Sequence, residues 1–390
     1  MPASPSSLIS SLSCAPALVG VPHASAGLPA VLAHVPDPRA ARGIRHRLPA
    51  VVSAAVCAVI AGYRSYTAIA EWAADASTAT VLALGIAPDR RPSEAMIRRL
   101  LQAIDPDLLT AAIGSWLAAQ ASGTAPASRR AIAVDGKTLR GSRDATTAAR
   151  HVLTAYDVNG GVVLAATDVE GKTNEITRFA PLLDQINDLS NTVITVDALH
   201  CQRDHVTYLT SRGADWILTV KGNQPKLRTQ LAGLPWKTVS PADRHEDRGH
   251  GRREIRTLKA VTIEAGIEFP HAVQALQIRR RRRRLDQPKR FTTETIYAIT
   301  NLRPHQARPA ELATWIRGHW AIENQIHWIR DVTYDEDRSQ IRTGTGPHVM
   351  AALRNAAISA LRTAGATNIA AANRHHARDS TRPPALLGIT

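Results

Sequence analysis

The spacing of apolar residues divides the chain into a helical first part and a strand-rich second part. Between residues 37 and 122, apolar side chains recur every three or four positions and alanine is frequent, a pattern typical of packed helices. It predicts helices at 50–61, 66–74, 93–104 and 108–121. We therefore expect an all-helical domain at 37–122, preceded by a flexible leader at 1–36 and followed by a linker at 121–130.

Short apolar runs then replace the helical pattern. The run at 130–134 ends at Asp135, and the runs at 151–158 and 162–169 flank Asn159-Gly160, a dipeptide typical of β-hairpin turns. These features predict three strands, of which the last two pair as a hairpin.

Two further apolar runs, at 192–196 and 216–220, are typical of buried strands, and a helical stretch at 203–212 separates them. The first of these runs ends at Asp197. Alternation of strands and helices predicts a mixed α/β sheet at 130–224, with both aspartates at the ends of neighbouring strands.

Residues 225–308 interrupt this order and contain a block of six arginines at 279–284. Strand-like alternation of apolar and polar positions recurs there at 254–263, 272–280 and 291–300. We expect a β-rich insertion at 225–308, the second part of the core at 309–365, and a loose basic tail at 366–390.

A predicted helix at 311–330 carries an acidic residue within its apolar face. The apolar positions of that face are Leu312, Trp315, Ile316, Ile322, Ile326 and Ile329. Glu323 falls among them, and the residues four positions away are His319 and His327 rather than Lys or Arg. A carboxylate directed into a core is costly unless a positive group meets it. Either Glu323 lies at the edge of the face and reaches water, or it holds a divalent metal ion with partners from elsewhere.

Charge and cysteine content narrow the class of protein. Lys and Arg number 48 against 33 Asp and Glu, and the net charge of +15 favours polyanions, nucleic acid before an anionic membrane. The three cysteines form no Cys-X-X-Cys pair, which argues against a disulfide framework and fits a reducing compartment. The longest apolar run, 50–62, is too short to span a bilayer, and no signal peptide is recognisable, so we expect a cytoplasmic protein without membrane contact.

Three isolated acidic residues are the candidates for chemistry: Asp135, Asp197 and Glu323. Neighbouring carboxylates repel one another, and cations relieve that repulsion. Oxygen ligands from Asp and Glu suit Mg²⁺ or Mn²⁺, whereas zinc prefers His or Cys. A pair of such ions activates an attacking oxygen and stabilises the leaving oxygen of a phosphodiester. With the basic surface, these residues point to DNA or RNA as the substrate.

Five motifs in order carry a resemblance to a known family. They are AVDGKTLRGS (133–142), VDALHCQ (196–202), DWILTVKGNQP (215–225), RGHGRREIR (248–256) and RGHWAIENQIHWIRDVTYDED (317–337). The set resembles the ISAs1 family of insertion-sequence transposases, within the DDE class related to the IS4 type. Residues 36–73 are similar to the helical domain that precedes the catalytic domain in that family.

The resemblance implies a ribonuclease H-like mixed sheet with flanking helices, and a DDE triad that falls on Asp135, Asp197 and Glu323. It implies cleavage of the element ends and strand transfer into target DNA, with two Mg²⁺ or Mn²⁺ ions held by the triad. The implied partners are the terminal inverted repeats and the target DNA, bound by a homo-oligomer in the bacterial cytoplasm.

Residues around the triad are the expected contacts to DNA: Lys137, Arg140, Lys221, Arg317, His319, Trp320, Asn324 and Arg330. In the IS4-type signature, Ile316 stands here at the position of a Tyr and His319 at that of an Arg, whereas Arg330 occupies the basic position. Trp320 either stacks on an unpaired base or packs against the insertion. The arginine block is either a solvated face or lies along a DNA backbone.

Simpler interpretations remain for individual residues. Asp135 is also suited to an Asp-Gly turn, and Asp197 to capping the following helix. An alternative third ligand could come from a later acidic cluster, and an alternative zinc site from the insertion. The cluster comprises Asp331, Asp335, Glu336 and Asp337, and the zinc ligands would be His245, Glu246 and His250.

Two other functions compete with an active transposase: a catalytically decayed DNA-binding remnant, and a host endonuclease that does not transfer strands. All three acidic residues and the motifs between them are present, which favours the active enzyme. Short inverted repeats in the DNA on both sides of the gene would indicate a mobile element.

Overall fold

A computed structural model describes residues 27–42, 44–122, 129–169, 175–249, 251–287 and 290–390. Residues 1–26 of the predicted leader, most of the predicted linker and His250 therefore lie outside the described residues. None of the described helices is long and apolar enough to cross a membrane.

The first part of the chain is helical, as its periodicity predicts. Its helices are α1 (Leu28–Leu32), α2 (Leu48–Ile60), α3 (Tyr66–Asp75), α4 (Thr78–Ala83), α5 (Glu94–Leu101) and α6 (Pro106–Ser122). Helix α2 is apolar on every side, and such a helix is stable only when it is surrounded by protein. The long helix α13 (Gly346–Thr363) packs against α2, α6 and the central sheet, and so joins the helical part to the catalytic part.

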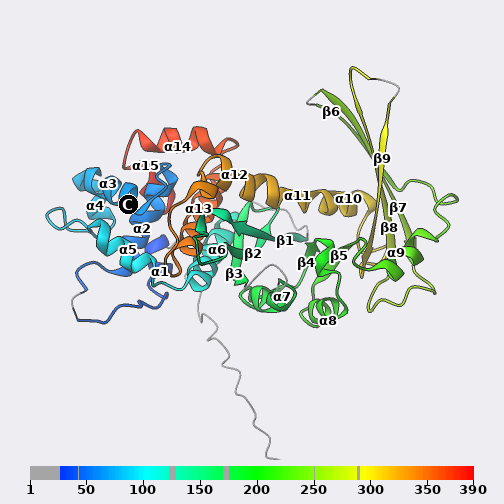
Figure 1. Cartoon of the computed structure of the whole chain (residues 1–390), viewed down its shortest axis with the longest axis horizontal. Coiled ribbons are helices and arrows are strands. Elements are labelled where there is room, and N and C mark those ends of the chain that lie inside the picture. The colour runs from blue at the N-terminus through cyan, green and yellow to red at the C-terminus, as the bar shows by residue number, and fades with distance from the viewer. Residues whose placement is uncertain (1–26, 43, 123–128, 170–174, 250, 288–289) are drawn as a thin grey trace, which may run out of the picture.

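The central sheet has the mixed α/β topology that the sequence predicts, in the ribonuclease H-like order β3-β2-β1-β4-β5. Its strands are β1 (Arg130–Leu139), β2 (Arg150–Asp157), β3 (Val162–Val169), β4 (Thr192–Val196) and β5 (Asp215–Val220). Strands β1 to β3 form an antiparallel meander, and β4 and β5 run parallel to β1. Helices α7 (Glu175–Asp184) and α8 (Arg203–Ser211) lie on the connections between strands (Figure 1).

The sheet continues into the segment that the sequence analysis treats as an insertion. Strands β6 (Asp243–Gly249), β7 (Arg252–Thr262), β8 (Gln274–Arg284) and β9 (Thr292–Thr300) follow a short helix, α9 (Pro225–Ala232). The β-rich content agrees with the alternating pattern, but β9 pairs with β5, so one nine-stranded sheet results. The expectation of a unit separate from the core sheet is therefore wrong. The reason is that β5 would otherwise expose an unpaired edge, which the apolar end of β9 covers. The outer parts of these strands project as an arm (Figure 1).

The acidic helix crosses from the arm to the helical domain along the sheet (Figure 1). It consists of α10 (Pro309–Gly318), α11 (Trp320–Ile322), a π-helical turn (Glu323–His327) and α12 (Trp328–Val332). A π turn closes hydrogen bonds between residues five apart and so shifts the faces of the helix. Glu323 starts this turn, and its side chain is 59% exposed rather than directed into the core.

Both ends of the described chain fold onto the helical domain, which corrects two expectations. Residues 28–35 are not part of a flexible leader, because Leu28 and Leu32 are fully buried. Residues 366–390 are not a loose tail, since they form α14 (Ile369–Ala377) and α15 (Arg382–Leu386) against α2. The Leu28 N–H donates to the Leu387 carbonyl over 3.0 Å. The reason is that α2 is apolar all round and needs both segments to cover it. The other predicted domain boundaries stay predictions.

Candidate active site

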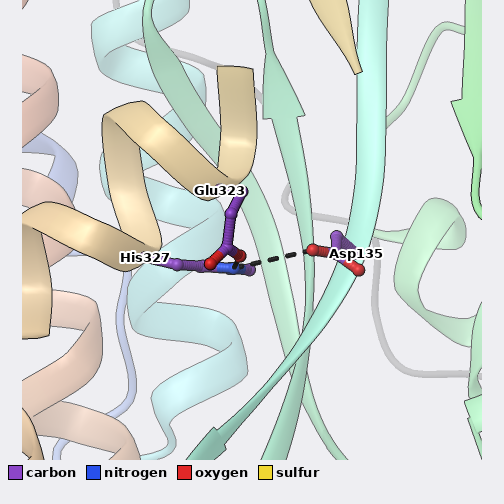
Figure 2. A group of neighbouring side chains, drawn as sticks. All are labelled: Asp135, Glu323 and His327. Atoms are coloured by element: carbon purple, nitrogen blue, oxygen red, sulfur yellow. Dashed lines mark hydrogen bonds and ion pairs between the residues drawn. The ribbon is translucent and has the colours of Figure 1, made fainter. Parts of the chain in front are cut away.

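Two of the predicted acidic residues meet across the gap between the sheet and the crossing helix. Asp135 projects from β1 and Glu323 from the first position of the π turn, and His327 lies one turn further on (Figure 2). The His327 Nδ1 is 3.0 Å from the Glu323 Oε2 and 3.6 Å from the Asp135 Oδ2. Ligand atoms of these three residues lie within 4.8 Å of one another, and among the described residues this is the one group of three arranged to share a metal ion.

Asp197 follows β4 beside Asp135, because Val134 pairs with Val196 in the parallel register of β1 and β4. One of its carboxylate oxygens accepts a hydrogen bond from the Leu199 N–H over 2.9 Å and caps a short 3₁₀ turn. The capping role considered from the sequence is therefore present. It directs that oxygen into the turn, and Asp197 stands outside the group of three ligands.

The carboxylates affect one another's protonation. Burial, together with the negative charges of Asp197 and Glu323, raises the pKa of Asp135 to about 7, although a backbone hydrogen bond from Gly136 lowers it. The hydrogen bond from His327 lowers the pKa of Glu323. A cation at this position would favour the ionised form of Asp135 and relieve the repulsion. The two carboxylates offer the oxygen ligands that suit Mg²⁺ or Mn²⁺, whereas the imidazole is a ligand typical of transition metals.

His327 is a functional candidate that the sequence analysis noted as a neighbour of Glu323 without assigning it a role. Its side chain is 2% exposed, and burial lowers its pKa, so the ring is neutral at physiological pH. A neutral ring can donate from Nδ1 to either carboxylate or offer that nitrogen to a metal ion. The i,i+4 spacing from Glu323 on a helix was the signal that could have identified it.

A second layer of buried charge lies behind the aspartates. The Glu175 carboxylate is 2.7 Å from the His151 Nε2 and 3.4 Å from the His200 Nε2. A Cβ built on Gly136 would lie 2.5 Å from that His151 nitrogen, so this cluster packs directly against the residue after Asp135. Burial alone would raise the pKa of Glu175, but the hydrogen bonds from the two histidines lower it to about 2.

Glu175 therefore links β2 to the turn after Asp197, because His151 belongs to β2 and His200 ends that turn. Sequence reasoning missed this cluster. Its members are 24 residues apart or more along the chain, and no local motif joins them.

Two of the predicted DNA contacts, Arg330 and His319, lie against other groups of the protein in this structure. Arg330 is fully buried, and its guanidinium binds both carboxylate oxygens of Glu336 at 2.7–3.0 Å. It therefore holds the chain after α12 and cannot reach DNA. His319 is half-buried, its Nδ1 lies 3.4 Å from the Thr195 hydroxyl, and burial lowers its pKa to about 4. A neutral ring in this position offers no cation to a phosphate.

The other basic residues near the site either form ion pairs inside the protein or remain accessible to solvent. The Lys137 ammonium is 2.7 Å from Asp331 and its side chain is 11% exposed, so it acts inside the protein, where its charge lowers the pKa of Glu323. Arg140 is 77% exposed and lies 3.3 Å from Asp337. Asp331 and Asp337 of the later acidic cluster thus pair with basic residues, and neither belongs to the candidate metal-ligand group among the described residues.

With Arg140, five predicted DNA contacts remain accessible, the others being Lys221, Arg317, Trp320 and Asn324. Trp320 is 59% exposed, which rules against the alternative that it packs against the insertion. The zinc alternative has little support, because Glu246 pairs with Arg253 at 2.5 Å and His250 lies outside the described residues.

A ribonuclease H-like sheet with one acidic residue on β1, one directly after β4 and one on a facing helix defines the class of DDE nucleases and transposases. A profile of the family described as "Transposase DDE domain" matches residues 126–360, and one described as "DDE_Tnp_1-associated" matches residues 30–117. The chain belongs to this family of DDE transposases.

Relatives agree with this assignment along most of the chain. "Putative transposase YncI" of Escherichia coli O157:H7 is 30% identical over 339 residues, which cover 84% of this chain and 85% of the relative. "H repeat-associated putative transposase YhhI" of Escherichia coli strain K12 is 27% identical over 340 residues, which cover 84% of this chain and 88% of the relative.

Among solved structures, a piggyBac transposase synaptic complex with hairpin DNA overlaps 93% of this chain and 76% of its own chain. The TM-score is 0.38 and the identity is 8%, which is too low a likeness to support a conclusion.

Proposed function

We propose that this protein is the transposase of an insertion sequence of the ISAs1 type, which cleaves DNA at the ends of its element and joins those ends to target DNA. The observation that carries the proposal is the approach of Asp135 and Glu323 across the gap between sheet and helix, with Asp197 on the adjoining strand. These residues lie in a segment that matches the DDE transposase domain.

Asp135, Asp197 and Glu323 would hold two divalent ions, Mg²⁺ or Mn²⁺. Such ions, when bound, activate the attacking oxygen and stabilise the leaving oxygen of a phosphodiester. The protein supplies the arrangement: β1 and β4 fix the two aspartates in register, and His327 and Lys137 orient Glu323 and favour its ionised form. Glu175 supports both aspartate-bearing segments from behind through His151 and His200.

DNA would be held by accessible basic residues rather than by those engaged inside the protein. Alternation along β8 places Arg279, Arg281 and Arg283 on one face of the arm and the other three arginines of the block on the opposite face. The second set faces carboxylates: Arg280 is 2.8 Å from Glu254 and Arg284 is 2.8 Å from Asp286. We therefore assign the DNA contact of the arm to the first face.

On that first face, the guanidinium groups of Arg281 and Arg283 lie 4.5 Å and 5.5 Å from the centre of the Phe291 ring. Stacking on a ring leaves the cationic charge in place for a phosphate. The face therefore keeps its positive charge, and a DNA backbone would release counterions from it.

The test is transposition from a donor plasmid that carries the gene between its natural flanking sequences. We expect the full-length protein to excise or copy the element and to join it to new DNA, with short repeats at both boundaries. Joined products separate this function from that of a host endonuclease, which would give cleavage alone. A purified protein that binds DNA but neither cuts nor joins it would instead be a decayed remnant.

A further inference from the structure

A groove of about 720 Å³ opens beside the candidate active site, between α12 and α14. The end of α2 and the end of α13 complete its lining, so it lies where the catalytic and helical parts meet (Figure 1). The residues that give it chemical character are Arg64, Asn324, Trp328, Val332, Arg362 and Arg374. None of them belongs to the group of metal-ligand candidates.

The lining is positively charged. Three arginines face the groove, and the described residues that line it include no Asp or Glu. Arg64 lies 4.0 Å from Asp335, whereas Arg362 and Arg374 form no ion pair with a described carboxylate. The Arg362 Nε is buried and has no hydrogen-bond partner among the described residues. Such a lining favours a polyanion over an apolar or acidic partner.

One wall of the groove is also apolar and aromatic. Trp328 is 56% exposed and Val332 is 57% exposed, although both belong to a helix whose other side is buried. Trp320, Asn324, Trp328 and Val332 are all exposed, so they mark the outer side of this helix. Asn324, which lines the groove, follows Glu323 directly in the chain, so the groove begins one residue from the candidate catalytic carboxylate.

We propose that this groove binds a single strand of DNA next to the catalytic carboxylates, an inference that rests on the proposed function. Exposed aromatic rings with arginines along a groove are the combination that holds unpaired strands, because bases stack on the rings while the cations meet the phosphates. Trp328 is the stacking platform, and Arg362 and Arg374 are the phosphate contacts. A duplex with all its bases paired has no free base to place on Trp328.

The experiment measures binding of two fluorescent DNAs to the full-length protein in the presence of EDTA, which prevents cleavage. One DNA is a blunt duplex, and the other is the same duplex with a short single-stranded tail, prepared with either polarity. We expect the wild type to bind one of the tailed forms about tenfold more tightly, the effect of one stacked base. Trp328→Ala should remove that advantage and leave binding to the blunt duplex unchanged.

Arg374→Ala should weaken binding of the tailed DNA and lower its salt slope by about 0.7, the value for one phosphate contact on a single strand. The matched controls are Arg378→Ala, an exposed arginine of the same region outside the groove, and Leu82→Ala, an apolar residue on α4 that is 57% exposed. Neither control should change the preference for a tail.

Three results would overturn the proposal: no advantage of a tail for the wild type, equal losses on blunt and tailed DNA in Trp328→Ala, or an altered oligomeric state of that variant with normal DNA binding. The last result would identify the groove as a protein interface. If the wild type transposes normally but shows no preference for a tail, only this inference fails. If it binds neither DNA, the proposed function fails as well.

Discussion

Asp135 on the sheet and His327 on the crossing helix approach to 3.6 Å between Oδ2 and Nδ1, and the same nitrogen lies 3.0 Å from Glu323. One imidazole thus bridges the two candidate catalytic carboxylates, which come from segments nearly 200 residues apart. Glu323 and His327 are four residues apart, at the first and last positions of the π turn.

His327→Ala should weaken binding of Mn²⁺ by about 10- to 100-fold, the range seen when a residue that orients metal ligands is removed. His327→Gln keeps one hydrogen bond to a carboxylate and should give a smaller loss. Isothermal titration of metal-free protein measures both variants without reference to activity. His305→Ala, an exposed histidine far along the chain from the site, is the control. Wild-type affinity in His327→Ala would show that the imidazole does not support the metal site.

The raised pKa of Asp135 makes stability depend on pH. Because its folded pKa is about 7 and its ordinary value is 3.8, the folded protein keeps a proton that the unfolded chain releases. The contribution of Asp135 to the free energy of unfolding is fully present below about pH 4 and is lost as the pH rises to about 7. Asp135→Asn cannot ionise, so its melting temperature should exceed that of the wild type by an amount that grows across this window and then levels off.

The control for that measurement is Asp286→Asn, an exposed aspartate of the arm, whose difference from the wild type should not change with pH between 5 and 8. Saturating Mg²⁺ should narrow the gap for Asp135→Asn, because a bound cation stabilises the ionised wild-type carboxylate. A gap that stays constant from pH 4 to pH 8 would mean that Asp135 ionises normally.

Glu175→Gln should lower the free energy of unfolding by about 1–3 kcal/mol, since it leaves His151 and His200 without their carboxylate. It should also shift the pH window of Asp135 to lower values, because the charge of Glu175 contributes to the raised pKa there. Denaturant unfolding and the pH series above measure the two effects. Glu294→Gln, an arm residue 51% exposed, is the control. A loss of stability without a shift of the Asp135 pH window would mean that Glu175 contributes only to packing.

The two faces of the arginine block should differ in their contribution to DNA binding. Arg281→Ala should lower the log–log salt slope on duplex DNA by up to about 0.9 and weaken all sequences alike. Arg282→Ala is the matched comparison on the opposite face, 3.8 Å from Glu294, and should have a smaller effect. Equal slopes for the two variants would mean that the arm does not present one face to DNA.

Local patterns in the sequence predicted the strands and the neighbouring positions of Asp135 and Asp197, because carboxyl ends of adjacent parallel strands meet at one edge. They also identified Glu323 as an acidic residue in an unusual position. They could not show the π turn, since the spacing of apolar residues does not record the extra residue.

Other features depend on partners distant in the chain or on an unusual backbone conformation. The pairing of β9 with β5 depends on which edge is free, and alternation carries no such information. The burial of Arg330 depends on Glu336, which can face it because Asp335 adopts a left-handed conformation with φ 52° and reverses the chain. From the sequence alone, Arg330 fits a basic DNA contact equally well.

The central claim is that Asp135, Asp197 and Glu323 form one catalytic site for DNA cleavage. The most direct measurement compares divalent-dependent cleavage of the element-end DNA by the wild type with that by Asp135→Ala, Asp197→Ala and Glu323→Ala, each checked for DNA binding in EDTA. We predict that each variant binds DNA normally and loses cleavage altogether. Cleavage at the wild-type rate in Asp135→Ala or Glu323→Ala would contradict the assignment of the site.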